Sequence, residues 1–249
     1  VYAGGQHFEY DQARVSEDVA HSFDRGSDNV HPFDGDQNAI DPFIGAKEDK
    51  YSFAKSPRYD VPGIGRLPLE AGPLARQIVA GKPATSDFQD YDPLFTDVLA
   101  KKGPSVLVRQ LARMHEAPKY YEKVLQWLGE IDLHGSFYQT PVDPVSARGY
   151  GGTEAARGAL QDWIVIEDGK IANYNVITPS AWNLGPRDKD ANVGPVEKAL
   201  IGTPIHNPED PIELGHVTRS FDACIVCTVH AYDGKTGREL SSFVINSMV

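Results

Sequence analysis

The sequence predicts a helix-rich α+β fold whose functional loops are buried in the middle of the chain. Apolar residues recur at helical spacing in residues 74–80 and 105–130. In contrast, DWIVIEDGKIANYNVI contains two strand-like runs joined by Asp168-Gly169, a pair typical of tight hairpin turns. A further helix is expected near residues 153–162, so that the hairpin follows it and leads into the functional loops.

The composition favours a folded chain that does not bind nucleic acid. Of the 249 residues, 41% are apolar, which is enough for a substantial core. The formal net charge of -11 argues against nucleic-acid binding, which needs clustered Lys and Arg. No stretch approaches the roughly 20 consecutive apolar residues of a membrane-spanning helix. The start, VYAGGQHFEY, lacks an initiator Met and the features of a signal peptide, so we expect a piece of a longer or split subunit.

Glycine, proline and N-cap residues predict where the helices begin and end. LPLEAGPLARQIVAG is expected to form a short helix that ends near Gly81. The helical pattern of SVLVRQLARMHEAPKYYEKVLQWLGEI is interrupted at Pro118, which predicts two helices that meet there, the first with Ser105 as its N-cap. VEKALIGTPI is expected to give one or two helical turns.

The remaining segments are expected to be less regular. Residues 1–65, rich in Asp, Gly, Pro and aromatics, predict loops with short extended pieces. TPSAWNLGPRDKDANVGP contains too many Gly and Pro residues for regular structure. The turn at residues 233–237 favours a hairpin in the tail.

The strongest chemical signal is a pair of cysteines near the C-terminus. Cys224 and Cys227 are the only cysteines, and His230 follows three residues after the second. Two thiolates at this spacing can converge on one soft cation, and the imidazole can bind a harder ion or orient the site. By spacing alone, a small zinc site with one further ligand is an equally good reading, and a redox dithiol is also open.

Four motifs in a fixed order resemble the C-terminal portion of nickel-iron hydrogenase large subunits. They are PLEAGPLAR (68–76), GGTEAARGALQDW (151–163), ANYNVITPSAWNLGPRD (172–188) and the segment 222–230, which resembles D-P-C-x-x-C-x-x-H. The segments HPFDG and KYSFAKSPRY are similar to uptake-type, cyanobacterial-like members of the family. The resemblance therefore covers nearly the whole chain.

The resemblance implies a set of metal ligands. Cys224 would be a terminal ligand of nickel, and Cys227 a thiolate that bridges nickel and iron. His230 would bind a magnesium or similar ion, with the backbone carbonyl of Val176 as another ligand, although His230 could instead orient the site. The family's N-terminal portion, which carries another C-x-x-C, would supply two more thiolates and a Glu ligand.

The resemblance also implies a pocket around the iron, which carries cyanide and carbon monoxide in this family. Ser180 and Arg187 would donate hydrogen bonds to cyanide, and Pro179 and Pro186 would line the pocket. The prolines would equally suit ordinary turns.

Cleavage of H2 needs a group that takes the proton, and two residues are candidates. These are Arg187, whose guanidinium is a poor free base, and the Cys224 thiolate. Asp222 would hold Arg187 by a charge-assisted pair, or would only cap a turn. The resemblance implies that Glu154 and Arg157 belong to an ordered polar network beside the site, although a solvated pair on a helix is an equally good interpretation. Glu70 and Arg76 are similar, with burial and ion pairing as the main expectation.

Two features depart from the family pattern. Ala223 stands where proline is usual, which loosens the backbone before Cys224. Nineteen residues, AYDGKTGRELSSFVINSMV, follow His230, after which a maturation endopeptidase cuts many relatives. We therefore expect residues 1–230 to form the hydrogenase portion and residues 231–249 to be an extension removed on maturation.

The sequence thus predicts the catalytic portion of a nickel-iron hydrogenase, active only with the N-terminal portion and an iron-sulfur small subunit. Nickel-insertion proteins and the maturation endopeptidase would be further partners, and the enzyme would lie in the cytoplasm or be attached to a membrane through a partner. Two alternatives stay open: a non-catalytic hydrogenase-like subunit of a redox complex, and a zinc-binding structural module.

Overall fold

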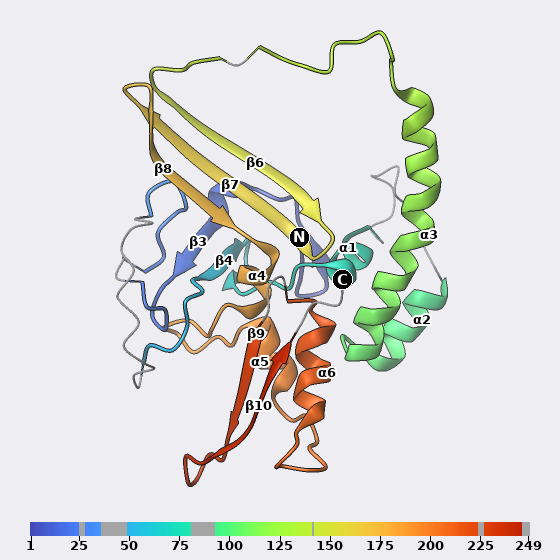
Figure 1. Cartoon of the computed structure of the whole chain (residues 1–249), viewed down its shortest axis with the longest axis vertical. Coiled ribbons are helices and arrows are strands. Elements are labelled where there is room, and N and C mark those ends of the chain that lie inside the picture. Colours follow the sequence, from blue (N-terminus) through green and yellow to red (C-terminus); the bar gives the residue numbers. More distant parts are fainter. Residues whose placement is uncertain (25–27, 36–48, 81–92, 141, 224–226, 246–249) are drawn as a thin grey trace.

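The computed structural model describes residues 1–24, 28–35, 49–80, 93–140, 142–223 and 227–245, and its fold is α+β (Figure 1). The described helices are the 3-10 helix η1 (Gln12–Arg14), α1 (Pro73–Ala80), α2 (Pro93–Lys102), α3 (Val106–Glu130), α4 (Pro179–Leu184), α5 (Pro195–Leu200) and α6 (Ile212–Ser220). The described strands are β1 (Tyr2–Ala3), β2 (Gln6–His7), β3 (Val15–Asp18), β4 (Ser56–Val61), β5 (Gly65–Leu67), β6 (Ala147–Ala155), β7 (Gly158–Glu167), β8 (Lys170–Ile177), β9 (Cys227–Tyr232) and β10 (Glu239–Ile245). Short strands in residues 1–65 agree with the prediction for that region.

The longest sheet is an antiparallel ribbon of β6, β7 and β8 (Figure 1). The predicted hairpin is confirmed, because β7 pairs with β8 through a turn in which Asp168 and Gly169 have φ of +51° and +69°. The predicted helix near 153–162 is wrong, since this segment ends β6 and begins β7. Along β7, Gln161, Trp163 and Val165 are buried at alternate positions, a period of two that belongs to a strand.

The main apolar core joins this ribbon to the sheet β3-β4-β5 and to α4. Its buried members are Ala3, Val15, Tyr59, Val61, Trp163, Ile177 and Trp182. Trp163 is 1% exposed and its Nε1 donates to Gln12 Oε1 at 2.8 Å, so the indole is both packed and hydrogen-bonded. The core therefore fixes the junction of β8 and α4.

A second apolar cluster lies between α1, α2 and α3, and consists of Leu74, Phe95, Val108 and Ala112. The predicted short helix is confirmed as α1, but the prediction of two helices meeting at Pro118 is wrong, because α3 continues through it. Proline removes one intrahelical hydrogen bond at a cost of about 3 kcal/mol, and the turns on both sides keep theirs. Ser105 is the N-cap residue, although its side chain makes no capping hydrogen bond.

The last three helices enclose a third cluster. Helix α5 is the predicted short helix, whereas α4 lies in a segment that was expected to be irregular. Thr178 Oγ1 accepts a hydrogen bond from the Ala181 amide and Pro179 occupies the first turn, which are strong signals for a helix start. Helix α6 is not among the predicted helices. Val196, Val217 and Phe221 form the cluster.

The tail forms the predicted hairpin, made of β9 and β10 in the lower part of Figure 1. In its turn, the Asp233 carboxylate accepts hydrogen bonds from the amides of Lys235 and Thr236, and Gly237 has a φ of +68°. Strand β9 runs across the predicted boundary between residues 230 and 231.

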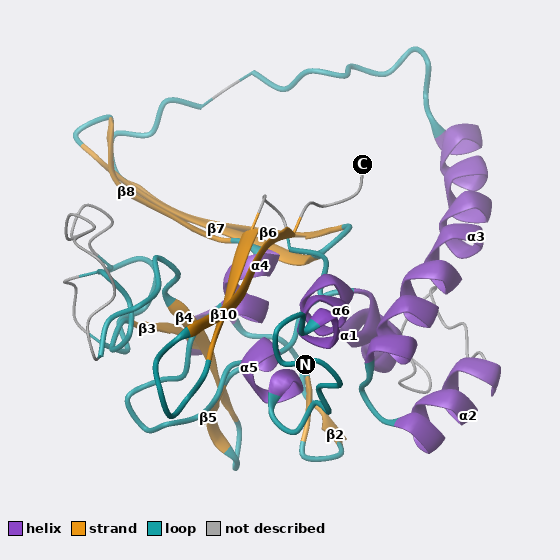
Figure 2. Cartoon of the chain, turned by 60° about the horizontal axis from the view of Figure 1, so that its bottom comes forward, coloured by secondary structure: helices purple, strands orange, loops and turns teal. Residues whose placement is uncertain are grey.

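Two views show how far α3 extends from the rest of the chain. Its C-terminal end stands apart, and residues 131–140 lead away from it as a loop toward β6 (Figures 1 and 2). Among the described helices, none is long and apolar enough to cross a membrane.

Two of the motifs found in the sequence meet at a glycine contact. A Cβ on Gly158, at the start of β7, would lie 2.7 Å from the Gly72 amide nitrogen and 2.8 Å from Ala71 Cβ, and Gly158 has a φ of +132°. The turn between β6 and β7 therefore packs directly on the residues that lead into α1, with no room for a side chain.

Gly158→Ala is expected to lower the free energy of unfolding by about 2–4 kcal/mol, because it adds both a clash and a disfavoured φ. Urea-induced unfolding measures this change. The control is Gly151→Ala in β6, where a Cβ would meet nothing within 4 Å, and its effect should stay below about 1 kcal/mol. Equal losses in the two variants would contradict the packing argument.

Candidate metal site

The predicted metal ligands lie where α6 leads into β9. Cys224 falls outside the described residues, and Cys227 and His230 are the first and fourth residues of β9, where the backbone alone is described. In the register of the hairpin, Cys227 is opposite Ile245 and His230 is opposite Ser242. Their roles as ligands remain predictions. Within the described part of the chain, no group of three or more His, Cys, Asp or Glu side chains could hold a metal ion.

Asp222, at the end of α6, has partners that differ from the predicted one. Its Oδ2 lies 3.5 Å from Arg157 Nε and 4.0 Å from Arg113 Nε. Arg187, after α4, is instead 3.6 Å from Glu197 Oε2 through its own Nε, and its side chain is 48% exposed. The predicted pair of Asp222 with Arg187 is therefore wrong. The reason is local, because α5 places Glu197 beside Arg187 while α3 and the β6–β7 turn place two arginines beside Asp222.

The loop after α4 is fixed by a buried arginine of β4. Arg58 Nε donates to Asp188 Oδ2 at 3.1 Å, and both side chains are fully buried. Arg58 Nη2 donates to the carbonyls of Pro186 at 3.0 Å and Asn192 at 3.2 Å, and Ser56 Oγ also donates to the Pro186 carbonyl. The residues on both sides of Arg187 are thus held by hydrogen bonds, while the Arg187 side chain remains partly exposed.

Burial alone would raise the pKa of Asp188, but hydrogen bonds outweigh it. The side chain and backbone N–H of Asn192 and the guanidinium of Arg58 all donate to the carboxylate, and the pKa of Asp188 falls below its ordinary value. Asp188 is therefore ionised at neutral pH and balances the buried charge of Arg58.

The other predicted pocket residues lie at the junction of β8 and α4. Val176 is opposite Asp162 in the ribbon, and its side chain is 40% exposed. Pro179 is buried at the first turn of α4 and Ser180 follows it. What these residues bind remains a prediction, but their backbone is well fixed, because α4 packs on β4, β7 and α5.

One apolar contact brings the two predicted site segments together. Leu184, at the end of α4, packs against the cluster that contains Val217 and Phe221 of the α6 segment. The loop of Pro186 and Arg187 and the segment that leads to Cys224 are therefore neighbours, although they are far apart in the sequence. That they form one site remains a prediction.

A belt of ion pairs connects α3 to the glycine contact of α1 and β7. Arg76 Nε and Nη2 bind the two carboxylate oxygens of Glu116 at 2.7 and 2.8 Å, and Arg76 Nη1 binds Glu154 Oε2 at 2.8 Å. Arg109 makes a second two-point pair with Glu70, with both distances at 2.8 Å. The ion pairing expected for Glu70, Arg76 and Glu154 is thus present.

The sequence did not single out the α3 members of this belt. Arg109 and Glu116 are each 6% exposed. The spacing of four and three residues among Arg109, Arg113 and Glu116 places them on one side of the helix, which is a signal that could have marked a buried charged stripe.

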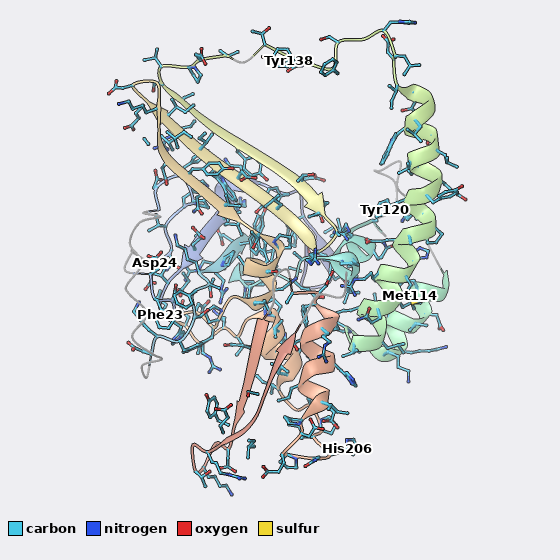
Figure 3. All side chains as sticks on the ribbon, viewed as in Figure 1. Phe23, Asp24, Met114, Tyr120, Tyr138 and His206 are labelled. Atoms are coloured by element: carbon cyan, nitrogen blue, oxygen red, sulfur yellow. The ribbon has the colours of Figure 1, made fainter. Side chains whose placement is uncertain are left out.

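A groove of about 1130 Å³ lies between the N-terminal segment, α1, α3 and the end of the β6–β7 ribbon. Tyr120, Val124 and Trp127 line it from α3, and Figure 3 shows Tyr120 on the side of α3 that faces the body of the chain. On the opposite wall, burial and a hydrogen bond with Tyr150 raise the pKa of Tyr10. The described residues predicted for the metal site do not line this groove.

Comparisons with known proteins identify relatives of the chain. Residues 3–230 match the family model of nickel-dependent hydrogenases. The periplasmic [NiFeSe] hydrogenase large subunit of Desulfomicrobium baculatum is 34% identical over 257 aligned residues, which cover 96% of this chain and 46% of that protein. The uptake hydrogenase large subunit of Bradyrhizobium diazoefficiens is 36% identical over 208 residues, covering 77% of this chain and 33% of that protein.

A solved structure agrees with these relatives. The reduced Ni-Fe-Se hydrogenase of Desulfovibrio vulgaris Hildenborough superposes with a TM-score of 0.74 at 33% identity, covering 90% of this chain and 46% of that one. The chain therefore spans less than half the length of each of these relatives.

Asp188→Asn is expected to lower the free energy of unfolding by about 3 kcal/mol, because it leaves the buried Arg58 without a counter-charge. Urea-induced unfolding at pH 7 measures the loss. Asp190→Asn is the matched control, since Asp190 pairs with Arg66 at 3.4 Å in the same loop but is 53% exposed, and it should cost no more than about 1 kcal/mol.

The difference in the free energy of unfolding between the native chain and Asp188→Asn should also depend on pH. A carboxylate whose pKa is lowered on folding contributes stability above its unfolded pKa, near 3.9, and loses it as the pH falls through the folded pKa. The difference between the native chain and Asp188→Asn should therefore shrink as the pH is lowered below about 4. A difference that grows in acid would contradict the assignment.

Proposed function

Because the chain belongs to the nickel-dependent hydrogenase family, we propose that it is the C-terminal portion of the catalytic subunit of a nickel-iron hydrogenase. Its reaction is the reversible, heterolytic cleavage of H2 into protons and electrons. The observation that carries the proposal is the contact of the cysteine-bearing segment with the loop of Pro186 and Arg187, through Leu184, Val217 and Phe221. Two motifs predicted to form one site are thereby neighbours.

The donor set of this segment fits a nickel-iron centre. Cys224 and Cys227 are the only cysteines of the chain and offer two soft thiolates at a spacing that suits one cation. Their segment is anchored by α6 on one side and by the pairing of Cys227 with Ile245 on the other. A four-thiolate cradle would be completed by two cysteines from the rest of the large subunit. When bound, the metals supply the site at which H2 is polarised.

The finer parts of the proposal concern the ligands of iron and a second ion. Ser180 and Arg187 would donate to cyanide on an iron that also carries carbon monoxide, with Pro179 and Pro186 as the apolar lining. His230 and the Val176 carbonyl would hold magnesium. Support comes from the fixed backbone at these positions, at the β8–α4 junction and in the loop held by Arg58.

The chain offers two groups for handling the proton. The Arg187 guanidinium offers only hydrogen-bond donors, and Glu197 orients it. The Cys224 sulfur is the better acceptor, because a thiolate has lone pairs that can take a proton, whereas a guanidinium has only donors. Asp222 is assigned no contact with Arg187 and serves the cysteine segment instead.

An exposed surface on α3 would bind the portion of the large subunit that this chain does not contain. On the second half of α3, Tyr121, Val124, Leu125 and Leu128 form an exposed apolar stripe at helical spacing. The stripe adjoins the groove described above through Val124, and contiguous exposed apolar residues are typical of an interaction surface. Because the chain spans 46% of its relative, we assign this surface to the remaining portion of the large subunit.

Further partners follow from the same proposal. Electrons would leave through an iron-sulfur small subunit, because the two cysteines here are committed to the metals. Nickel-insertion proteins and a maturation endopeptidase would act on the chain, in the cytoplasm or at a membrane to which a partner attaches it. A cut after His230 would remove β10 and so free the backbone of Cys227 and His230 from its strand partner.

The natively purified chain, with its companions, should contain about one nickel and one iron and show infrared bands of cyanide and carbon monoxide. Cys224→Ser and Cys227→Ser should each lose nickel and iron, because each removes a soft ligand. Met114→Leu, which removes an exposed sulfur and keeps an apolar side chain, is the control and should retain both metals. Elemental analysis decides, and zinc alone in the native chain would overturn the proposal.

Leu125→Asp should weaken binding of the remaining large-subunit portion by about tenfold or more, because it puts a charge into the apolar stripe. Gln126→Asp changes the opposite, polar side of α3 and should bind as the native chain does. Affinity measured by sedimentation or calorimetry distinguishes the two variants. Equal affinities would place the companion elsewhere.

A further inference from the structure

We propose that Arg109, Arg113 and Arg157 act as an arginine clamp that positions the segment leading into Cys224. The clamp holds residues 220–222, which are the last residue of α6 and the two residues after it. The proposal rests on the proposed function only where it takes Cys224 and Cys227 as metal ligands. The contacts themselves involve described residues alone.

Arg113 of α3 holds the end of α6 at two points. Its Nη2 donates to the Ser220 carbonyl at 3.3 Å, and its Nε lies 4.0 Å from Asp222 Oδ2. The Ser220 carbonyl is one of the last of its helix and has no partner within the helix. A cation placed there also interacts favourably with the negative end of the helix dipole.

Arg157 approaches the same carboxylate from the β6–β7 turn. Its Nε lies 3.5 Å from Asp222 Oδ2, and this buried nitrogen has no hydrogen-bond partner, so the ion pair is its contact. The turn that carries Arg157 cannot shift easily, because Gly158 packs on Ala71 and Gly72 without space for a Cβ. Arg157 is therefore presented to Asp222 from a rigid support.

Arg109 holds the residue between these two contacts. Its guanidinium carbon lies 3.9 Å from the centroid of the Phe221 ring, a cation–π distance, while Glu70 fixes the guanidinium by a two-point pair. Phe221 itself is 5% exposed and packs with Val217. Three consecutive residues are thus each contacted by an arginine from another element.

The backbone of the segment explains why such a clamp is useful. Asp222 has a φ of +54°, in the left-handed region that costs a residue with a Cβ about 1 kcal/mol or more. The next residue is Ala223, which leaves its own φ unrestricted where proline would fix it. Side-chain contacts to residues 220–222 supply the restraint that the backbone at Ala223 does not.

The three arginines come from elements that the fold already holds together. Arg109 and Arg113 are one turn apart on the side of α3 that packs on α6, and Arg157 lies in the turn next to α1, which packs on α3. Figure 2 shows α6 and α1 next to each other with α3 to their right, and α3 contacts both helices. The positions of α3 and of the turn next to α1 thereby determine where residues 220–222, before Cys224, can lie.

Amide hydrogen exchange of the full chain with its companions tests the clamp. In Arg157→Ala, Arg113→Ala and Asp222→Asn, the amides of Phe221 and Asp222 should exchange about two- to fivefold faster, as expected for the loss of partly exposed ion pairs. Exchange in the β7–β8 hairpin should stay unchanged. Arg148→Ala, which removes an exposed pair with Asp34 in another region, is the matched control and should leave residues 220–222 as in the native chain.

Two further measurements separate positioning from general stability. Alkylation of Cys224 and Cys227 should be faster in the clamp variants, and Arg157→Lys should restore part of the native rate because it keeps the charge. In the double variant Asp222→Asn with Arg157→Ala, the effects should not add, because both changes break one contact.

Unchanged exchange at residues 220–222, or fully additive effects, would overturn the clamp. The outcome of the hydrogen-exchange experiment does not depend on whether the metals are present. A native chain without nickel and iron would contradict the proposed function and leave the exchange experiment valid, and a metal-containing chain with unchanged exchange would contradict the clamp alone.

Discussion

The buried ion pair of Arg58 and Asp188 is the constraint on which the site loops depend. Both side chains are fully buried, and Arg58 also binds the carbonyls of Pro186 and Asn192. A buried charge with an incomplete set of partners is costly, so the loop can neither lose Asp188 nor swing away from β4 without a large penalty. The main apolar core in turn fixes β4, through Tyr59 and Val61. Arg187 is therefore anchored on both sides of its backbone while its side chain stays accessible.

A second group of charges controls the other half of the site. Arg76 and Arg109 use two-point pairs with Glu116 and Glu70 to join α3 to the residues around α1. The same helix then reaches Phe221 and Asp222 beyond α6. Charged residues dominate here because a planar guanidinium fixes direction as well as distance, which apolar packing does less well. The site is thus placed by two ionic frameworks with the Leu184 contact between them.

The sequence predicted features that depend on local patterns and missed those that depend on distant partners. The hairpin at Asp168-Gly169, helix α1 and the tail hairpin follow from turn chemistry and periodicity, and all three are present. Residues 153–162 were expected to form a helix, but the pairing of β6 with β7 across this segment overrides its local helix propensity. The partner of Asp222 could not be predicted, because α3 and the β6–β7 turn decide it. No local pattern marks Arg58 as buried.

The apolar surface of α3 has a consequence for how the site forms. The first half of the helix is buried against α1 and α2 and carries Arg109 and Arg113, while the second half exposes its apolar stripe. A single rigid helix therefore links a surface that needs a companion to the residues that hold the cysteine segment. Binding of the companion on the second half would restrain the orientation of the first half, and with it Phe221 and Asp222. On this argument, completion of the subunit and the placement of Phe221 and Asp222 are coupled through α3, because both depend on the direction of its axis.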